Sequence, residues 1–351
     1  MKRLGFILSF ALMTISMAAG TISVVPGSGA LSAIIGQAQA GDVLLLADGQ
    51  YDESSNIVIS IPLTICAAEG AKPVLLTGGR IEVKADLRVS GLSIETNTAA
   101  EAFRLQPGEE IYSLYLQGCS IKGFSSKTIR VYATDQEAAY VDSLVIDDCV
   151  LQPSAGRGLE ASVANKQVQH LLIQNATFDG GQSGVGRLIY FNSEEGTTVQ
   201  SATIDHCTFY NAADTRGIYL GNVDGAQVTN CIFMNPEYNA DYKSYCVYGK
   251  NTLLSHSISC NADAYVRSGA YASNVSTQNP YFVDASNGNF QLYKNSPAIA
   301  MSTDGGAIGD PRWGISEQEA DRSKEPYRPY KMPYSMAPTT TSVSGTSSCL
   351  N

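Results

Sequence analysis

Apolar and polar positions alternate in a phrase that recurs along the middle of the chain. Each copy has eight residues. Two apolar positions, each followed by a variable residue, precede a small or polar residue and then a cysteine or alanine; a variable residue and a final apolar residue complete the copy. Copies occupy residues 114–121, 144–151, 171–178, 202–209 and 226–233. The cysteine-or-alanine position, which we call the marker, is Cys119, Cys149, Ala176, Cys207 and Cys231, at steps of 30, 27, 31 and 24 residues. Two weaker copies, one before and one after these five, have Leu92 and Ser257 at the marker position. A strand-like repeat of this length predicts a solenoid in which each coil buries its apolar face on its neighbours.

The residue before each marker predicts the backbone conformation at that point. It is Gly118, Asp148, Asn175, His206 and Asn230 in the five copies. Glycine, asparagine and aspartate tolerate the left-handed conformation, so we expect a sharp bend between two strands here. We therefore interpret His206 as a bend residue in preference to a catalytic one, and His256 likewise if its copy belongs to the series.

The chain on either side of the repeats has other patterns. Residues 31–38 place their apolar side chains on one face of a helix, which predicts a short amphipathic helix that caps the N-terminal end of the solenoid. Residues 41–51 (GDVLLLADGQY) predict a buried strand, an Asp-Gly turn and an aromatic packed over the turn. Residues 279–308 predict a last strand and a loop that covers the C-terminal end of the stack.

These flanking phrases carry a family resemblance. Residues 41–76 (GDVLLLADGQYDESSNIVISIPLTICAAEGAKPVLL) resemble the opening coils of the pectate-lyase-like superfamily. The ending GDPRW at 309–313 resembles exported, functionally unassigned β-helix domains of polysaccharide-degrading bacteria. The resemblance implies an all-β fold, a right-handed single-stranded parallel β-helix with an N-terminal capping helix, over residues 21–314.

The two ends of the chain lie outside this predicted domain. Residues 1–20 contain Lys2 and Arg3, an apolar run and then small residues, which is typical of a secretory signal peptide. The run is too short for a comfortable membrane span, and no cysteine follows it to carry a lipid anchor. We expect a secreted, periplasmic or extracellular protein without a membrane span. Residues 315–351, rich in Pro, Tyr, Ser and Thr, predict a disordered tail.

Composition narrows the classes of partner. The formal net charge of −10 over 351 residues disfavours nucleic acid. Four of the eight cysteines are markers. We expect these to stack as buried free thiols, in preference to the ladder disulfide that a coil spacing of about 4.8 Å also allows. The chain has no Cys-x-x-Cys or His-x-x-x-His pair to suggest a zinc site. The expected state is a monomer.

Aligning the repeats reveals a column of cations. Lys127, Arg157, Arg187 and Arg216 follow one another at steps of 30, 30 and 29, each two residues before an apolar strand position. Stacking like charges is unfavourable unless something anionic lies among them. Two explanations stay open: local pairing with carboxylates of the protein, or a groove for an acidic polysaccharide. The carboxylates considered for pairing are Glu101, Asp214, Glu194 and Glu195.

A second column is predicted beside the cations. Strand alternation points its residues outward, between inward apolar neighbours. Its tyrosines suit contact with sugar rings, because each offers a flat face and a hydroxyl; the alternative is an aromatic ladder that stabilises the sheet. Next to the cations, we favour sugar binding. The column is Arg104, Arg130, Glu160, Tyr190, Tyr219 and Tyr248. The residues assigned to substrate binding from both columns are Lys127, Arg130, Arg157, Tyr190 and Tyr248.

Residues 203–209 (TIDHCTF) resemble the W-I-D-H-C-x-F segment of pectate lyases, with Thr203 in place of the tryptophan. Those enzymes remove the proton alpha to a uronate carboxylate, using calcium to acidify it and an arginine as base. Their arginine-rich catalytic segment has no match in the repeats. For a lyase we assign Arg187 or Arg216 as base or carboxylate clamp, Lys243 or Lys250 as an alternative base, and Tyr219 as proton donor. The candidate calcium ligands are Asp205, Asp214 and Glu194.

Three functions fit this pattern. The first is an extracellular lyase that cleaves an acidic, uronate-containing polysaccharide by β-elimination. The second is a glycan-binding protein without catalytic activity that uses the same groove. The third is a structural or adhesive β-helix in which both columns serve stability.

Overall fold

The computed structural model describes residues 19–96, 98–108, 110–133, 137–161, 166–182, 184–191, 197–212, 216–235, 245–261, 264–267 and 269–322. The predicted signal peptide, apart from its last two residues, and most of the predicted tail lie outside these ranges. Within them, no helix is long and apolar enough to cross a membrane.

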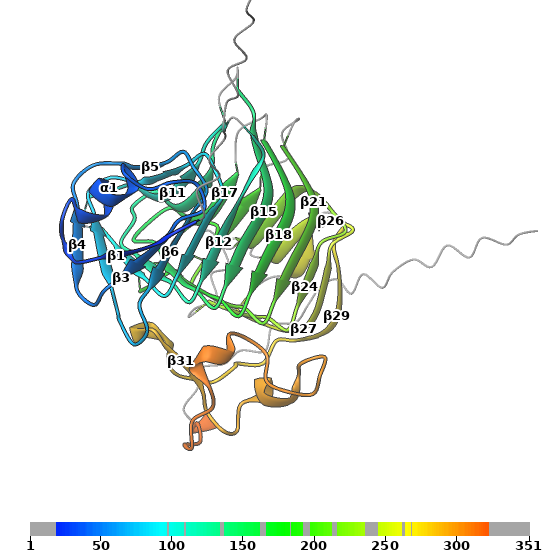
Figure 1. The fold of residues 1–351 in the computed structure, drawn as a ribbon. Coiled ribbons are helices and arrows are strands. Elements are labelled where there is room, and N and C mark those ends of the chain that lie inside the picture. The colour runs from blue at the N-terminus through cyan, green and yellow to red at the C-terminus, as the bar shows by residue number, and fades with distance from the viewer. Residues whose placement is uncertain are drawn as a thin grey trace, which may run out of the picture.

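The chain winds as a parallel β-helix with three rows of strands, which we call the first, second and third faces (Figure 1). Each strand pairs in parallel with the strand at the same position of the next coil. The all-β parallel β-helix prediction is confirmed, while its handedness stays a prediction. The first face contains β1 (Thr21–Val24), β3 (Val43–Leu46), β6 (Leu63–Ala67), β9 (Leu87–Ser90), β12 (Tyr112–Gln117), β15 (Ala139–Asp147), β18 (Lys166–Gln174), β21 (Thr197–Asp205), β24 (Gln227–Thr229), β27 (Leu253–Cys260) and β29 (Tyr271–Ser276).

The other two faces follow in each coil. The second face contains β2 (Gly27–Ser28), β4 (Gln50–Glu53), β7 (Val74–Thr77), β10 (Ser93–Glu95), β13 (Ser120–Lys122), β16 (Val150–Gln152), β19 (Thr177–Asp179), β22 (Thr208–Tyr210) and β25 (Ile232–Met234). The third face contains β5 (Ile57–Ile59), β8 (Ile81–Val83), β11 (Glu101–Leu105), β14 (Lys127–Val131), β17 (Arg157–Ala161), β20 (Ile189–Phe191), β23 (Arg216–Asp224), β26 (Tyr245–Lys250) and β28 (Ala264–Arg267).

The predicted bend joins the first and second faces. Its residues all have a left-handed backbone, with φ of +62° at Gly118, +50° at Asp148, +51° at Asn175, +47° at His206 and at His256, and +53° at Asn230. The bend prediction is therefore confirmed, and His256 belongs to the series. A one-residue bend of this kind turns the chain without interrupting either row of strands.

The markers form one continuous column. The amide after each marker donates to the carbonyl of the preceding marker, from Leu92 to Ser257, at 2.8–3.0 Å. Both weaker copies thus belong to the repeat. Cys119, Cys149, Cys207 and Cys231 are buried and unoxidised, which confirms the prediction of free thiols.

The N-terminal coils also follow their predicted pattern. Tyr51 is fully buried, and its hydroxyl donates to the carbonyls of Val24 at 2.7 Å and Ala47 at 3.0 Å, so the aromatic does pack over the turn. Helix α1 (Ala30–Ile35) buries Leu31 and lies at the blue N-terminal end of the stack (Figure 1). The helix is only one and a half turns long, and its role as a cap stays a prediction.

The prediction that the closing residues cover the C-terminal end of the stack is wrong. Residues 279–322, which we call the C-terminal segment, run along the outer side of the second face instead. Its Ile308 and Leu292 form a hydrophobic cluster with Ile232 and Ile258, which point outward and would otherwise be exposed. The segment contains β30 (Phe282–Asp284), β31 (Asn289–Leu292) and the 3₁₀ helices η1 (Ala285–Asn287), η2 (Pro297–Ala300) and η3 (Pro311–Trp313).

Polar contacts fix the C-terminal segment in place. The hydroxyl of Thr177 donates to Asp310 at 2.7 Å and accepts from the indole of Trp313 at 2.8 Å. The amide of Asp310 donates to the hydroxyl of Thr208 at 3.0 Å. The described residues extend to 322, past the predicted boundary at residue 314, and Ile315 forms an isolated β-bridge with Leu292.

Candidate functional site: the cationic surface of the third face

The strand register brings the predicted cations together. Lys127 pairs with Arg157, and the strand positions two residues later pair through Leu159, Ile189 and Ile218. Arg187 therefore follows Arg157 in the next coil, and Arg216 follows as the first residue of β23. The predicted stacking is confirmed for Lys127 and Arg157. The same alignment puts Arg187 and Arg216 at the corresponding positions of the next two coils.

The outward column has the predicted register. Its pairs run without interruption from Glu82 in β8 to Tyr248 in β26. We call the two columns together the cationic surface. The members of the outward column are Glu82, Arg104, Arg130, Glu160, Tyr190, Tyr219 and Tyr248.

The loops that precede the third-face strands stack closely and leave a recess of about 320 Å³ beside the cations, lined by Ser126, Lys127, Arg157 and Arg187 among others. Gly156 makes this stacking possible. Its φ is +77°, and a Cβ there would lie 1.8 Å from the carbonyl oxygen of Ser126 in the neighbouring coil. Only a residue without a side chain fits, so the loop that carries Arg157 can approach the loop that carries Lys127.

Glu160 is the buried anchor of the cationic surface. Its side chain is 2% exposed, and its carboxylate lies 3.6 Å from Nζ of Lys127 and 3.9 Å from Nε of Arg130. Arg157 also donates to it. A buried carboxylate is expensive to desolvate unless cations surround it, and here three do so. Sequence reasoning placed Glu160 in the outward column but did not recognise it as the counter-ion. Its place in the outward column directly after Arg130, with Arg157 of the cation column on the same strand, was the available signal.

Glu101 holds the preceding coil in the same way. It accepts from Nε of Arg104 at 2.5 Å and from Nη1 of Arg130 at 3.0 Å, and Nη1 of Arg80 lies 4.0 Å away. Burial would raise the pKa of the Glu101 carboxyl, but the guanidinium groups of Arg104 and Arg130 outweigh burial and lower it. Glu101, one of the carboxylates considered for pairing with the cation column, forms its ion pairs with Arg80, Arg104 and Arg130 instead. Lys127 and Arg157 of the cation column pair with Glu160, which was not among those carboxylates.

The tyrosines continue the surface toward the C-terminal coils. The ring centroids of Tyr190 and Tyr219 are 5.1 Å apart, and those of Tyr219 and Tyr248 are 4.3 Å apart in a stacked arrangement. The guanidinium carbons of Arg157 and Arg187 each lie 4.3 Å from the centroid of Tyr190, and that of Arg187 lies 5.0 Å from Tyr219. Cations and ring faces therefore form one continuous array, held by cation–π contacts.

Lys127 has an electrostatic environment unlike that of an ordinary surface lysine. Burial, followed by repulsion from Arg130 and Arg157, lowers its pKa, although Glu101 opposes this. Its Nζ donates to the hydroxyl of Ser126 at 3.0 Å. A lysine with a lowered pKa releases its proton more readily than a solvated one.

Among the described residues on and beside this surface, cations outnumber carboxylates, although the protein as a whole is acidic. Lys127, Arg130 and Arg157 keep 21%, 20% and 31% of their side chains exposed. An anionic ligand could therefore reach them. The cations are Arg80, Arg104, Lys127, Arg130, Arg157 and Arg187, against Glu82, Glu101 and Glu160.

The structure does not bring Asp205 to this surface. Asp205 ends β21 on the first face, where its carboxylate accepts from Thr229 at 2.5 Å, Asn230 at 2.8 Å and Nδ1 of His206 at 2.7 Å. These bonds lower its pKa despite burial. Nε2 of His206 lies 3.2 Å from the hydroxyl of Ser302, so the segment that resembles pectate lyases here contacts the C-terminal segment.

The remaining predicted residues can be placed only in part. Lys243, Asp214, Glu194 and Glu195 lie outside the described residues, and Arg216 is described only as a strand residue. Lys250 is largely exposed and pairs with Asp224 at 2.8 Å. In the described ranges, no three His, Cys, Asp or Glu side chains are grouped to hold a metal ion. Calcium binding stays a prediction.

Comparisons with known proteins leave the activity open. Residues 49–167 match the family model Domain of unknown function (DUF4957), and residues 202–313 match Domain of unknown function (DUF5123). No curated protein matches the chain. Two solved structures are similar, a mutant of the PL6 family alginate lyase AlyGC and the unmutated AlyGC. The mutant is 18% identical in sequence over 77% of this chain, with a TM-score of 0.49. The unmutated enzyme is 16% identical over 74% of this chain, with a TM-score of 0.41. The chain spans about two fifths of that lyase, 41% and 40%.

Proposed function

We propose that the cationic surface binds an acidic, uronate-containing polysaccharide. The observation that carries this proposal is the stacking of Lys127, Arg157 and Arg187 beside the ladder of Tyr190, Tyr219 and Tyr248. Cations repeat once per coil, at a spacing of about 4.8 Å. A polymer with a carboxylate on successive sugars presents repeated charges to match, and the partly exposed tyrosines offer ring edges and hydroxyls for contact with its sugars.

The partial neutralisation by Glu101 and Glu160 fits this proposal. The two carboxylates keep the guanidinium groups close together in the free protein, where they would otherwise repel one another. Among the described side chains of this surface, cations outnumber carboxylates, which supports binding of an anionic ligand over a purely structural role.

We further propose that the cationic surface cleaves the bound polysaccharide by β-elimination. A base removes the proton alpha to the uronate carboxylate, the resulting enolate-like charge is stabilised by cations, and the glycosidic oxygen leaves with a proton. Arg187 or Arg216 would clamp the carboxylate or act as base, with Lys243 as an alternative, and Tyr219 would donate the proton to the leaving oxygen. The lowered pKa of Lys127 adds a further candidate base that the sequence did not indicate.

Where calcium takes part, Asp214 and Glu194 remain its proposed ligands, whereas Asp205 lies on the first face and is bound by Thr229, Asn230 and His206. Export through the predicted signal peptide and a monomeric state belong to the same proposal. The alternative function is a glycan-binding protein that uses the same surface without catalysis.

The test combines an absorbance assay with binding. Purified protein is mixed with polygalacturonate, alginate and glycosaminoglycans, and the ultraviolet absorbance of an unsaturated uronate is followed. We expect binding that weakens with added salt, and an absorbance increase on one polymer. Salt-sensitive binding without absorbance would leave the glycan-binding alternative, and neither signal on any acidic polymer would contradict the proposal as a whole.

Arginine variants locate the binding. We expect Arg187→Ala to weaken binding of the acidic polymer by about tenfold or more, because it removes a charge that contacts both Tyr190 and Tyr219. The matched control is Arg88→Ala. Arg88 lies 4.0 Å from the ring of Tyr115 on the first face, so this change removes the same charge and the same type of contact elsewhere. Equal losses in both variants, or a large fall in melting temperature in Arg187→Ala, would point to a structural role.

A further inference from the structure

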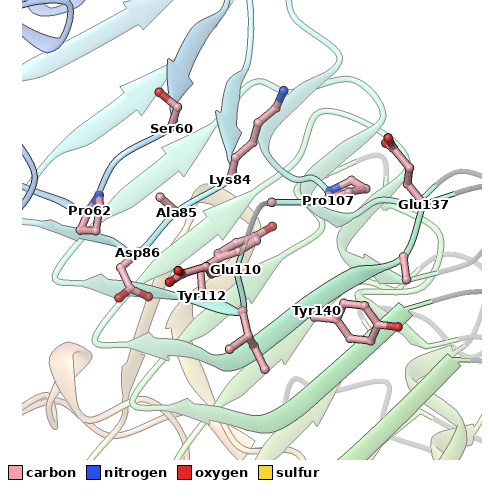
Figure 2. A pocket seen from close by; sticks show the side chains of 13 residues that line it. Ser60, Pro62, Lys84, Ala85, Asp86, Pro107, Glu110, Tyr112, Glu137 and Tyr140 are labelled. Atoms are coloured by element: carbon pink, nitrogen blue, oxygen red, sulfur yellow. The ribbon is translucent and has the colours of Figure 1, made fainter. Parts of the chain in front are cut away.

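A second recess, of about 1070 Å³, lies at the corner where the third-face strands end and the first-face strands begin (Figure 2). It exists because consecutive first-face strands differ in length. β9 has four residues, β12 has six and β15 has nine. The beginnings of β12 and β15 therefore extend past β9 and leave open space above the loops of the earlier coils. This recess lies at the opposite end of the third-face strands from Lys127 and Arg157.

Apolar side chains in this recess are unusually exposed. Tyr140 is 47% exposed and Ile111 is 49% exposed, and both line it together with Pro62 and Pro107. Figure 2 shows Tyr140 at one side of the recess, with Pro62 and Pro107 at other positions around it. Exposed large apolar groups that gather in a concave site indicate a ligand that covers them.

The polar groups of the recess are mainly carboxylates. Asp86, Glu110 and Glu137 line it, together with Lys84 (Figure 2). One carboxylate oxygen of Asp86 accepts from the amide of Ser113 at 2.7 Å, which fixes the orientation of that side chain. Carboxylates accept hydrogen bonds from hydroxyl groups, and they repel a carboxylate ligand. The recess thus has the opposite charge preference to the cationic surface.

We propose that this recess binds an uncharged sugar unit of a glycan, which packs against Tyr140 and donates its hydroxyls to Asp86 and Glu110. The combination of a flat aromatic face with hydrogen-bond acceptors and one lysine donor matches a hydroxyl-rich ring. A uronate is disfavoured by three carboxylates, and a wholly apolar ligand would bury those charges without hydrogen bonds. Small-molecule sites have volumes of roughly 300–1,000 Å³, so the recess has room for a short oligosaccharide. The inference does not depend on the cationic surface.

The test uses neutral oligosaccharides as probes. Cellohexaose, mannohexaose, xylohexaose and galactohexaose are titrated into the full-length mature protein, with saturation-transfer NMR and calorimetry as readouts. We expect one of them to bind, and Tyr140→Ala to weaken that binding on the order of tenfold. Glu110→Gln tests the acceptor role separately. The matched control is Tyr271→Ala, because Tyr271 is 41% exposed on β29, at the other end of the first face.

The outcomes separate this inference from the proposed function. Loss of neutral-sugar binding in Tyr140→Ala with unchanged binding in Tyr271→Ala and Arg187→Ala would support the recess. The inference is overturned if none of these neutral oligosaccharides binds, or if Tyr140→Ala binds as well as the unmodified protein. None of these results bears on whether acidic polymers bind the third face.

Discussion

At the scale of single residues, the buried carboxylates determine how the third face is built. Glu160 and Glu101 each contact at least three cations within 4.0 Å or by a direct hydrogen bond. Neither carboxylate has appreciable exposure to water, so solvent screens these pairs little. Removing one such carboxylate leaves several cations without a counter-ion, and that cost exceeds the loss of any single pair.

We expect Glu160→Gln to lower the free energy of unfolding by roughly 3–5 kcal/mol at neutral pH, because Lys127, Arg130 and Arg157 lose their buried counter-ion. Urea unfolding checks this. The control is Asp224→Asn, which breaks an exposed pair with Lys250 (55% and 70% exposed) and should cost at most about 1 kcal/mol. Similar small costs for both variants would show that Glu160 is not an anchor. If the variant also binds acidic polymer more tightly, the carboxylate competes with the ligand for the same cations.

At the scale of elements, the coil-to-coil contact of loops is as important as strand pairing. The third-face strands β14 and β17 pair regularly, but their cations approach only because the preceding loops stack. Gly156 lies at this contact with a φ of +77°, and a Cβ there would lie 1.8 Å from the carbonyl oxygen of Ser126. Gly225 has the same φ of +77°, yet a Cβ there would meet nothing within 4 Å. Substituting Gly225 therefore measures the cost of backbone strain alone, whereas substituting Gly156 adds the cost of steric crowding.

We expect Gly225→Ala to cost about 1–2 kcal/mol, which is the penalty for a left-handed residue with a side chain. Gly156→Ala should cost a further 1–3 kcal/mol or so, because its new methyl group must displace the neighbouring loop. Melting temperatures of the two variants give the comparison. Gly156→Ala should also weaken any binding to the cationic surface, whereas Gly225→Ala should not. Equal destabilisation would mean that the loop yields easily and that the close approach is unimportant.

At the scale of the whole molecule, the C-terminal segment connects several coils through groups that titrate. Burial raises the pKa of Asp310 to about 6, from an ordinary 3.8, although Thr177 and Arg312 oppose this. The hydrogen bond to Asp205 raises the pKa of His206, burial opposes it, and Asp304 raises it further. Both groups bind a proton more tightly in the folded protein. Each therefore contributes stability that is complete below its unfolded pKa and is lost as the pH rises through its folded pKa.

We expect the stability of the unmodified protein to fall between about pH 4 and pH 6 through Asp310, by up to about 3 kcal/mol for a shift of this size. Asp310→Asn should remove this part of the pH dependence and stabilise the protein at pH 7. Urea unfolding at several pH values measures it. The control is Asp284→Asn in the same segment, since hydrogen bonds from Asn287 and Ser286 lower the pKa of that carboxyl. An unchanged pH profile in Asp310→Asn would show that Asp310 is ionised at little cost.

The sequence predicted the columns of the third face because coil length varies little there. Lys127 and Arg157 are 30 residues apart, and their strands pair residue for residue. The role of Glu160 could not be predicted in the same way. Alternation along the strand points it outward, and only the folding of long cation side chains from both columns over it makes it buried. The place of Asp205 was equally hidden, since its partners Thr229 and Asn230 come from the next coil.

The sequence by itself determined the coil, its bend, the inward and outward sides of each strand and the columns that repeat from coil to coil. These follow from local backbone preferences and from a period, both of which are written along the chain. Tertiary structure alone decided which charges pair, where the C-terminal segment packs and where the recess beside Tyr140 opens. The hydroxyl of Thr177 and the carboxylate of Asp310 are 133 residues apart in sequence, yet lie 2.7 Å apart in the structure. Contacts of that kind depend on which surfaces the finished coils leave uncovered, and no period in the sequence encodes them.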